Sequence, residues 1–338
     1  MRVADAHNDL LLAVMHQRER GQSDPFGDFW LPQLRAGGVA LQFLAVFTED
    51  QHVGEGALRR CLLLLEEARN IAEMHQADVA VVETREDLDR ALASDRIGLV
   101  LAIEGSEPIG HSLGVLETFW RLGVRCMSLT WNRRTMLADG AGEAATRAGL
   151  TTLGKEAVAE MERLGMILDV SHLSAAGFDH AAGISKRPFV ATHSSCHALC
   201  PHPRNLTDEQ LRDLAESGGV VGINSFGGFL STGTPTLDDY LAHIEHAVAV
   251  VGPAAVGLGC DFMEDLLEVL DPILGAGLVD PSDMPFVTGM RGPSDLGPFS
   301  ALLVDRLGIE TAERVAGENW IDLLRRVLPS ESQRGSRE

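Results

Sequence analysis

Six side chains of the kinds that bind metal ions each follow a short apolar run in this 338-residue chain. They are His7, Asp9, Glu104, His172, His193 and Asp261. Imidazole nitrogens and carboxylate oxygens are the usual ligands of zinc and similar first-row cations. A carboxylate has two oxygens, so Glu104 can bridge two ions that lie about 3.5–4 Å apart. The set predicts a centre of two metal ions that activates water for attack on a substrate.

The spacing of these residues divides them into two groups. His7 and Asp9 are two positions apart, so on a strand both side chains point to one face and can reach one ion. His172 and His193 end two consecutive apolar runs and can hold a second ion. Asp261 can be a ligand or can accept the proton of the activated water. Taken singly, each histidine could instead be a hydrogen-bonded structural residue, and either aspartate could cap a helix.

A second zinc interpretation comes from the segment between residues 193 and 202. It contains Cys196, His197, Cys200 and His202 in addition to His193. A small structural zinc site is conceivable there. These ligands do not form two well-separated pairs, however, so we favour the first interpretation, in which both cysteines are packing residues.

The elements that would position these side chains are eight short apolar runs with amphipathic helical segments between them. The runs are Val3–His7, Val39–Val46, Gly98–Glu104, Val124–Trp131, Gly165–His172, Pro188–His193, Gly219–Ser225 and Ala255–Asp261. A strand buried on both faces has this continuous apolar pattern. Alternation of such strands with helices predicts an α/β fold, a (β/α)₈ TIM barrel. In this barrel polar residues at the strand ends meet at the C-terminal face.

The chain length suits one such barrel with insertions. We expect a single catalytic domain over residues 1–329 and a disordered polar tail over residues 330–338. The loops Asp24–Leu34 and Phe262–Pro298 exceed a minimal barrel, and we expect the second to cap the substrate pocket.

Composition excludes several classes of function. The formal net charge of −21 disfavours binding to nucleic acid or to an anionic membrane. No run of about 20 apolar residues could span a bilayer, and the N-terminus lacks the pattern of a signal peptide. Five cysteines, an odd number, argue against a disulfide framework. We therefore expect a cytoplasmic protein with a small-molecule substrate; a homodimer is possible, but no sequence feature fixes an interface.

Arg204 is the best candidate for binding an anionic group of that substrate. It follows the sixth apolar run, in the sequence HPRN. A guanidinium group matches a carboxylate in bidentate geometry. The alternative is a salt bridge to one of the many acidic side chains of the chain.

The motifs also carry a resemblance to a known family. HND near the N-terminus, AIEGSEPIG, LTWNRRTMLADG, LDVSHLS, ATHSSCHALCPHPRNLTDEQL and VGLGCDF follow one another in this order. Together they resemble the membrane dipeptidase (renal dipeptidase) family of zinc peptidases, within the amidohydrolase barrel superfamily. The resemblance extends from His7 to Gly317–Trp320, which is nearly the whole chain.

The resemblance implies two zinc ions per chain and a dipeptide substrate, with tolerance for a D-residue at its C-terminal position. By position, the residues would be His7 and Asp9 for one ion, His172 and His193 for the other, Glu104 as the bridge, Asp261 as the acid/base, and Arg204 for the C-terminal carboxylate. The expected protein is a soluble, bacterial-type member of this family without a membrane anchor.

Two positions depart from the family pattern. In animal members a histidine that positions the substrate follows the LT dipeptide, where this chain has Trp131, and Phe226 stands where they have a tyrosine. Tryptophan has no acid/base function, so Trp131 and Phe226 are expected to contact the substrate without transferring protons. Alternatives are a related two-metal amidohydrolase acting on a lactone, cyclic amide or N-acyl amino acid, and a metal-binding protein that has lost catalysis.

Overall fold

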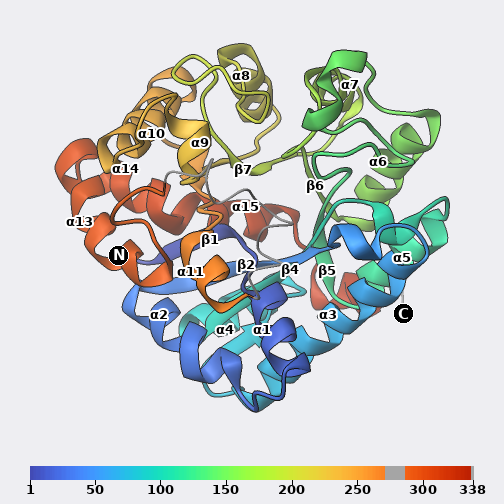
Figure 1. Cartoon of the computed structure of the whole chain (residues 1–338), viewed down its shortest axis with the longest axis horizontal. Coiled ribbons are helices and arrows are strands. Elements are labelled where there is room, and N and C mark those ends of the chain that lie inside the picture. Colours follow the sequence, from blue (N-terminus) through green and yellow to red (C-terminus); the bar gives the residue numbers. More distant parts are fainter. Residues whose placement is uncertain (271–285, 336–338) are drawn as a thin grey trace.

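Eight parallel strands form a nearly closed barrel in the computed structural model, which describes residues 1–270 and 286–335 (Figure 1). The strands are β1 (Val3–Asn8), β2 (Val39–Phe47), β4 (Ile97–Glu104), β5 (Val124–Ser128), β6 (Ile167–Asp169), β7 (Ala191–Ser194), β8 (Val221–Ile223) and β9 (Val256–Leu258). Their order in the sheet is β6-β5-β4-β2-β1-β9-β8-β7. Each strand overlaps one of the eight apolar runs, so the predicted TIM-barrel fold is confirmed.

The ring closes between β6 and β7 through a single bridge that pairs Asp169 with Val190. The Val190 N–H donates to the carbonyl of Leu168 at 2.9 Å, and the Val190 carbonyl accepts the N–H of Val170 at 2.7 Å. The Asp169 carboxylate adds two bonds across the junction, from the N–H of Thr192 at 3.0 Å and from its hydroxyl at 2.5 Å. A side chain thus supplements the short backbone ladder at this point.

One further strand was not predicted from the sequence. β3 (Val79–Val81) pairs with the beginning of β4 outside the ring. It has three residues, and only Val79 is fully buried. This length is too short to produce a recognisable apolar pattern.

Helices surround the barrel (Figure 1). They are α1 (Leu10–Glu19), α2 (Leu31–Ala36), α3 (Gly56–Met74), α4 (Arg85–Ala93), α5 (Leu113–Arg121), α6 (Thr152–Leu164), α7 (Ala175–Ile184), α8 (Asp208–Glu216), α9 (Gly227–Leu230), α10 (Leu237–Val251), α11 (Glu264–Val269), α13 (Leu296–Leu307), α14 (Ile309–Glu313), α15 (Asn319–Val327) and α16 (Glu331–Gly335). α8 begins at a capping box, in which Thr207 and Gln210 exchange hydrogen bonds. None of the described helices is both long and apolar enough to cross a membrane.

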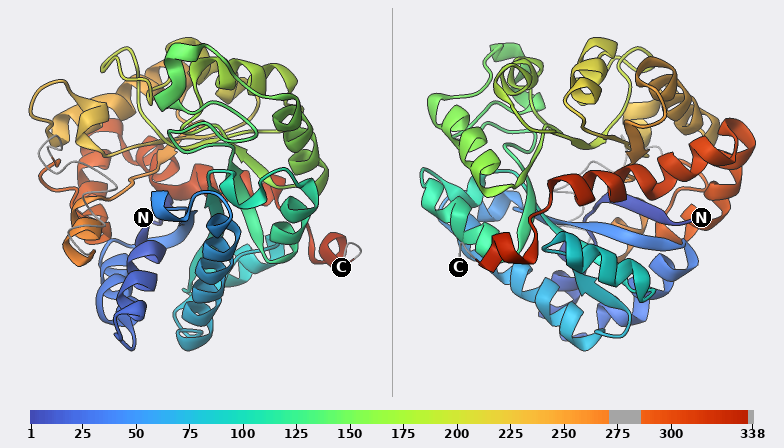
Figure 2. Two further views of the ribbon diagram at one scale, coloured as in Figure 1. Left: turned by 45° about the vertical axis from the view of Figure 1, so that its right-hand side comes forward. Right: turned by 180° about the vertical axis from the view of Figure 1, so that it is seen from behind.

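α15 crosses the N-terminal end of the barrel (Figure 2). Its residues Trp320, Ile321 and Leu324 are buried against the barrel residues Ala4 and Phe43. The indole N–H of Trp320 donates to the carbonyl of Leu258 at 3.0 Å. This apolar packing fills one end of the barrel, which leaves the other end for polar side chains.

The two loops that exceed a minimal barrel contain short helices. In the first, residues Phe26–Trp30 form a π-helical turn with Trp30 buried. In the second, α11 covers Glu264–Val269, and residues 271–285 lie outside the described part. The expected disordered tail contains α16 over Glu331–Gly335 and extends beyond the described residues at 336–338.

Candidate active site

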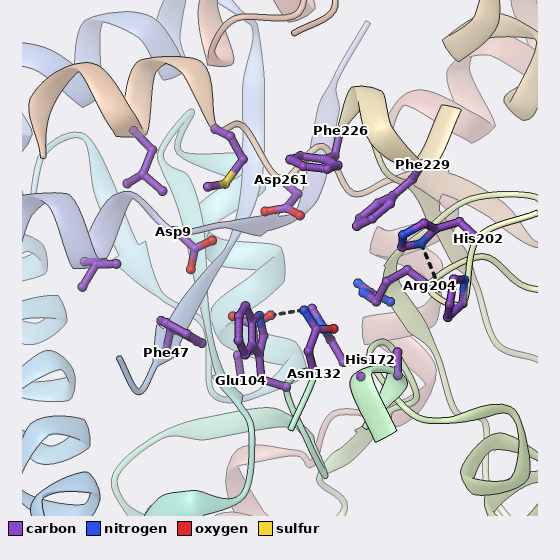
Figure 3. Close-up of a pocket in the computed structure, with 17 residues that line it drawn as sticks. Asp9, Phe47, Glu104, Asn132, His172, His202, Arg204, Phe226, Phe229 and Asp261 are labelled. Atoms are coloured by element: carbon purple, nitrogen blue, oxygen red, sulfur yellow. Dashed lines mark hydrogen bonds and ion pairs between the residues drawn. The ribbon is translucent and has the colours of Figure 1, made fainter. Parts of the chain in front are cut away.

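A cavity of about 410 Å³ opens at the C-terminal ends of the strands (Figure 3). Its polar lining includes Asp9, Glu104, His172, Arg204 and Asp261, and its apolar lining includes Leu12, Phe47, Trp131, Phe226, Phe229, Met263 and Leu266. Polar groups from distant parts of the sequence therefore converge on one space. Figure 3 shows Asp9, Glu104 and Asp261 directed into this space, with Arg204 directed into it from the opposite side.

The first cluster of side chains that could bind a metal ion is centred on His7. Its Nε2 atom lies 3.5 Å from Asp9 Oδ2, 3.8 Å from Glu104 Oε2 and 4.0 Å from Asp261 Oδ1. Asp9 occupies the N-cap position of α1, yet its side chain makes no capping hydrogen bond. Asn8 accepts the N–H of Leu10 instead, at 2.9 Å. The Asp9 side chain therefore does not cap α1, which was the alternative, and it lines the cavity instead.

The second cluster contains the other two histidines. Glu104 Oε1 lies 2.9 Å from His172 Nε2 and 3.5 Å from His193 Nε2. The two Nε2 atoms are themselves 2.7 Å apart. Glu104 therefore turns one oxygen to each cluster, which is the arrangement that a bridging carboxylate requires.

The Nδ1 atoms of His172 and His193 each lie within hydrogen-bond distance of an oxygen that accepts. His172 Nδ1 lies 2.9 Å from Asn132 Oδ1, an amide oxygen that can only accept. His193 Nδ1 lies 2.8 Å from the hydroxyl of Thr192, whose proton is donated to Asp169. Both Nδ1 atoms therefore carry hydrogen, and two Nε2 lone pairs face each other. Such a pair is stable when a cation lies against it, so the donor set fits a metal ion.

The pKa shifts describe a site that accumulates negative charge. Burial alone would lower the pKa of His7, but the carboxylates of Glu104, Asp9 and Asp261 outweigh burial and raise its pKa to about 10. Burial raises the pKa of Glu104 well above its usual value and also raises the pKa of Asp261. Positive charge beside these buried carboxylates would therefore be stabilising, and divalent cations would supply it.

The other side of the cavity is different, because burial lowers the pKa values of both His172 and His193 well below the ordinary histidine value. The nearby charge of Arg204 acts in the same direction on both rings. These two histidines are therefore neutral, which is the form that binds metal.

Arg204 is buried without a carboxylate partner among the described residues. Its Nη2 donates to the carbonyl of His193 at 3.0 Å, and its guanidinium lies over the ring of Phe229 at 5.5 Å. Its Nε atom is buried and has no hydrogen-bond partner in the described part of the chain. Burial lowers its pKa to about 10. The salt-bridge alternative is thus absent here, and Arg204 has free donors beside the cavity.

Two of the candidate residues have strained backbones. His172 and Asp261 adopt φ values of 67° and 54°, a region that side chains with a Cβ rarely occupy. Asp261 Oδ2 also accepts the amide of Asn224 at 3.0 Å. Strain retained at such positions is typical of functional sites, where the fold holds a side chain in one orientation.

Sequence reasoning missed three residues that position the candidate site. Asn132 orients His172, Thr192 orients His193, and Asn224 orients Asp261. All three directly adjoin or lie within the apolar runs that the sequence analysis identified. Their neighbourhood was therefore visible, but which polar side chain meets which ligand depends on the packing of different strands.

Trp131 and Phe226 both lie in the wall of the cavity. The Trp131 ring meets Phe47 edge-on at 5.3 Å, and the guanidinium of Arg133 lies over it at 5.1 Å. Phe226 packs against Phe229 at 4.6 Å. Both rings form fixed apolar surfaces.

The alternative zinc site in the segment 193–202 is not formed. Within the described residues, the groups that could hold a metal are His7–Glu104–His193 and His7–Asp9–Asp261, and neither contains cysteine. The Cys196 N–H donates to His243 Nδ1 at 2.9 Å, and its thiol donates to the carbonyl of His243 at 3.3 Å. All five cysteines are buried and none forms a disulfide.

Comparison with known proteins identifies the family. The profile of the membrane dipeptidase family, peptidase family M19, matches residues 1–290. The chain belongs to this family. An uncharacterised dipeptidase of Schizosaccharomyces pombe is 32% identical over 286 residues, which cover 77% of this chain and 68% of the relative. This member of the membrane dipeptidase family is accordingly a peptide hydrolase of the metallo-dipeptidase type.

Two solved structures of metallo peptidases have the same architecture. A metallo peptidase from Rhodobacter sphaeroides, bound to a phosphinate mimic of L-Ala-D-Ala, matches with a TM-score of 0.84 and 28% identity over 97% of this chain and 99% of its own. A dipeptidase AC matches with a TM-score of 0.85 and 29% identity over 98% and 99%. The M19 fold thus accounts for the whole barrel described here.

Proposed function

We propose that this chain is a zinc-dependent dipeptidase that hydrolyses dipeptides with a free C-terminal carboxylate, including L-Xaa-D-Xaa dipeptides. The observation that carries the proposal is the buried guanidinium of Arg204, without an ion pair among the described residues, opposite two clusters that share Glu104. The L-Ala-D-Ala mimic bound by the Rhodobacter sphaeroides relative supports a dipeptide of this stereochemistry.

The residues fit two zinc ions. His7 and Asp9 would hold one, His172 and His193 the other, and Glu104 both. Zinc bound there would supply Lewis acidity and would lower the pKa of water. All five of these residues are buried, and electrostatic effects are larger there than in water.

The chain's own side chains provide the remaining steps. Asp261 takes a proton from the attacking water and returns it to the leaving amine, and Asn224 holds its carboxylate in place. Arg204 binds the terminal carboxylate of the substrate and so places the scissile carbonyl at a fixed distance from Asp261. Trp131 excludes water from one wall and transfers no proton.

The cavity walls favour apolar substrate side chains. Phe229 lies against the guanidinium of Arg204, so it faces the C-terminal residue of the dipeptide, and Phe226 lies between Phe229 and Asp261 (Figure 3). Leu12, Met263 and Leu266 form part of the remaining apolar wall. We therefore expect higher kcat/KM for dipeptides of Ala, Leu or Met than for dipeptides with charged side chains.

The first experiment removes and restores metal. Hydrolysis of L-Ala-D-Ala should disappear after dialysis against a chelator and should return on titration with zinc, with full activity near two ions per chain. Activity that survives complete removal of metal refutes the proposal. Faster hydrolysis of a lactone, cyclic amide or N-acyl amino acid than of any dipeptide would assign the chain to another amidohydrolase activity.

The second experiment tests the carboxylate contact with a matched pair of substrates. Arg204→Lys should raise KM for L-Ala-D-Ala by at least about tenfold, because lysine keeps the charge but loses the bidentate fork. The C-terminal amide of the same dipeptide should be a poor substrate for both proteins. Equal loss on both substrates would show that Arg204 does not bind the carboxylate.

A further inference from the structure

A second cavity, of about 190 Å³, lies at the opposite end of the barrel from Asp261. It is formed by the turns that precede β6 and β7 and by the C-terminal end of α15, the helix that crosses this end (Figure 2). Three arginines, Arg85, Arg187 and Arg326, line it, together with apolar residues and Gln333. Among the described residues, no acidic side chain contributes to the lining, although the chain has 49 acidic residues and 28 Lys and Arg residues.

Two of these arginines are held by backbone carbonyls. Arg187 Nη1 donates to the carbonyl of Glu162 at 2.9 Å, and Arg326 Nη2 donates to the carbonyl of Gly218 at 2.9 Å. A carbonyl fixes a guanidinium group without neutralising its charge. Within the described residues, the three arginines make no ion pair, whereas Arg306 pairs with Glu245 at 2.7 Å. The guanidinium groups of this cavity therefore have no ion-pair partner among the described residues, although the Glu162 carboxylate accepts the backbone N–H of Arg187 at 3.1 Å.

Arg85 provides an independent observation. Its backbone N–H donates to the carbonyl of Pro329 at 3.1 Å, which ties the beginning of α4 to the segment after α15. Its Nε atom is fully buried and has no hydrogen-bond partner in the described residues. A buried donor without an acceptor reduces stability, and folded proteins seldom retain one unless ordered water or a bound group satisfies it.

We propose that this cavity binds a phosphate-type oxyanion, either free phosphate or the phosphate group of a small ester. Guanidinium groups match the oxygens of phosphate in geometry and charge. A tetrahedral dianion can accept hydrogen bonds from three directions at once, as the three arginines require. The proposal does not depend on the dipeptidase reaction, because no residue of this cavity lines the first one.

A ligand here would join segments that are far apart in the sequence: the beginning of α4, the turns before β6 and β7, and the end of α15. Binding to the folded state alone raises the free energy of unfolding. The expected signature is therefore an increase in melting temperature with phosphate concentration at constant ionic strength.

The experiment is calorimetric titration of the metal-loaded full chain with inorganic phosphate and, separately, with glycerol phosphate. Arg85→Gln should weaken binding of phosphate by at least about tenfold and should abolish most of the thermal shift. It should leave L-Ala-D-Ala turnover in phosphate-free buffer unchanged. Arg85 is the variant of choice because no hydrogen bond of its side chain to a described residue would be lost.

The matched control is Arg325→Gln. Arg325 neighbours Arg326 on α15, but its Nε lies 3.1 Å from Asp89 Oδ1. The control should bind phosphate as the wild-type protein does. Phosphate that binds instead at the metal centre is recognised because Arg204→Lys would weaken it while Arg85→Gln would not. If Arg85→Gln lowers the melting temperature in the absence of phosphate, Arg85→Lys replaces it as the test variant, because lysine keeps the positive charge but lacks the bidentate guanidinium group.

The outcomes separate the possible ligands. Binding of both phosphate and glycerol phosphate that depends on Arg85 supports a site for free and esterified phosphate, and binding of phosphate alone restricts it to the free ion. The proposal is refuted if no binding event depends on Arg85, or if Arg325→Gln weakens binding as much as Arg85→Gln does.

Discussion

The two ends of this barrel differ in the side chains that they bury, although the same strands form both. At the C-terminal end, the strands terminate in buried charges, left-handed backbone conformations and polar atoms held by one or two hydrogen bonds. At the N-terminal end, Trp320 and its neighbours on α15 pack against Ala4 and Phe43. Apolar packing at the N-terminal end stabilises the fold. This stabilisation offsets the cost of burying polar groups at the C-terminal end, which would be more stable in water.

This contrast explains why the site can be strained without loss of the fold. His172 and Asp261, which have positive φ values, both lie at the C-terminal end and line the cavity. Substitutions at that end should therefore affect turnover or metal affinity more than stability, and substitutions at the other end should do the reverse. The experiments below test this separation.

Asp261→Asn should have the largest effect. General acid–base catalysis contributes about 10²–10⁴-fold to rate, so kcat for L-Ala-D-Ala should fall by a factor in this range. Asparagine keeps the shape of the side chain, so the melting temperature should change little. Turnover is measured at saturating zinc, with metal content by atomic absorption as the control. Nearly full turnover in this variant would remove Asp261 from the reaction.

Trp320→Ala should be the most damaging change at the apolar end. Removal of a fully buried tryptophan costs about 3–5 kcal/mol of unfolding free energy, and here the hydrogen bond to Leu258 is lost as well. Urea denaturation measures the loss, and kcat per folded molecule should be unchanged. Leu302→Ala, at a partly exposed position of α13, is the control and should stay within about 0.5 kcal/mol of the wild-type protein. A large fall in kcat with intact stability would contradict the separation of the two ends.

Thr192→Val should weaken metal binding although Thr192 is not itself a proposed ligand. It removes the hydroxyl that links His193 Nδ1 to Asp169, so the ring loses its fixed tautomer. Loss of such an outer partner typically costs about 10–100-fold in metal affinity. Competition with a zinc indicator measures the affinity, and Thr192→Ser should restore it. If Thr192→Val binds zinc as tightly as the wild-type protein, the hydroxyl does not position His193.

Asp139→Asn should have the smallest effect. Hydrogen bonds from Arg134, and then from Thr146, hold the pKa of Asp139 below its usual value. The carboxylate therefore stabilises the fold above its unfolded pKa of about 3.9, and this contribution is lost as the pH falls through the lower folded value. Arg134 is largely exposed, so the difference from the wild-type protein should be about 0.5–1 kcal/mol near neutral pH.

The measurement is urea unfolding of both proteins at about pH 7 and about pH 3, on either side of the unfolded carboxyl pKa. The difference between them should shrink at the lower pH and in high salt. A difference that grows on acidification would mean that the carboxylate is destabilising.

The sequence predicted the barrel well because the buried parallel strands are continuous apolar runs. Each such run is long enough to be recognised, and several, such as Gly98–Glu104, have a polar residue at the C-terminal end. β3 was missed because three residues, of which only Val79 is fully buried, leave no pattern. α15 was missed as the element that closes the apolar end, because an amphipathic helix does not reveal in its sequence what it covers.

The candidate residues could be named from the sequence because their types and positions are local properties. Their pairings could not. The contacts of His172 with Asn132 and of Arg204 with the carbonyl of His193 join segments whose separation in space only the fold sets. That Arg204 has no ion-pair partner among the described residues was likewise invisible, since acidic residues that could pair with it are numerous in the sequence.

The junction of β6 and β7 has a consequence for how this protein responds to metal. His172 follows the first of these strands and His193 belongs to the second, so one ion bound by both would cross-link the ring at its weakest seam. Chelation should then loosen the barrel there before anywhere else. Hydrogen exchange of the amides of Val170 and Val190 would accelerate on zinc removal, while amides between β2 and β4 would stay protected.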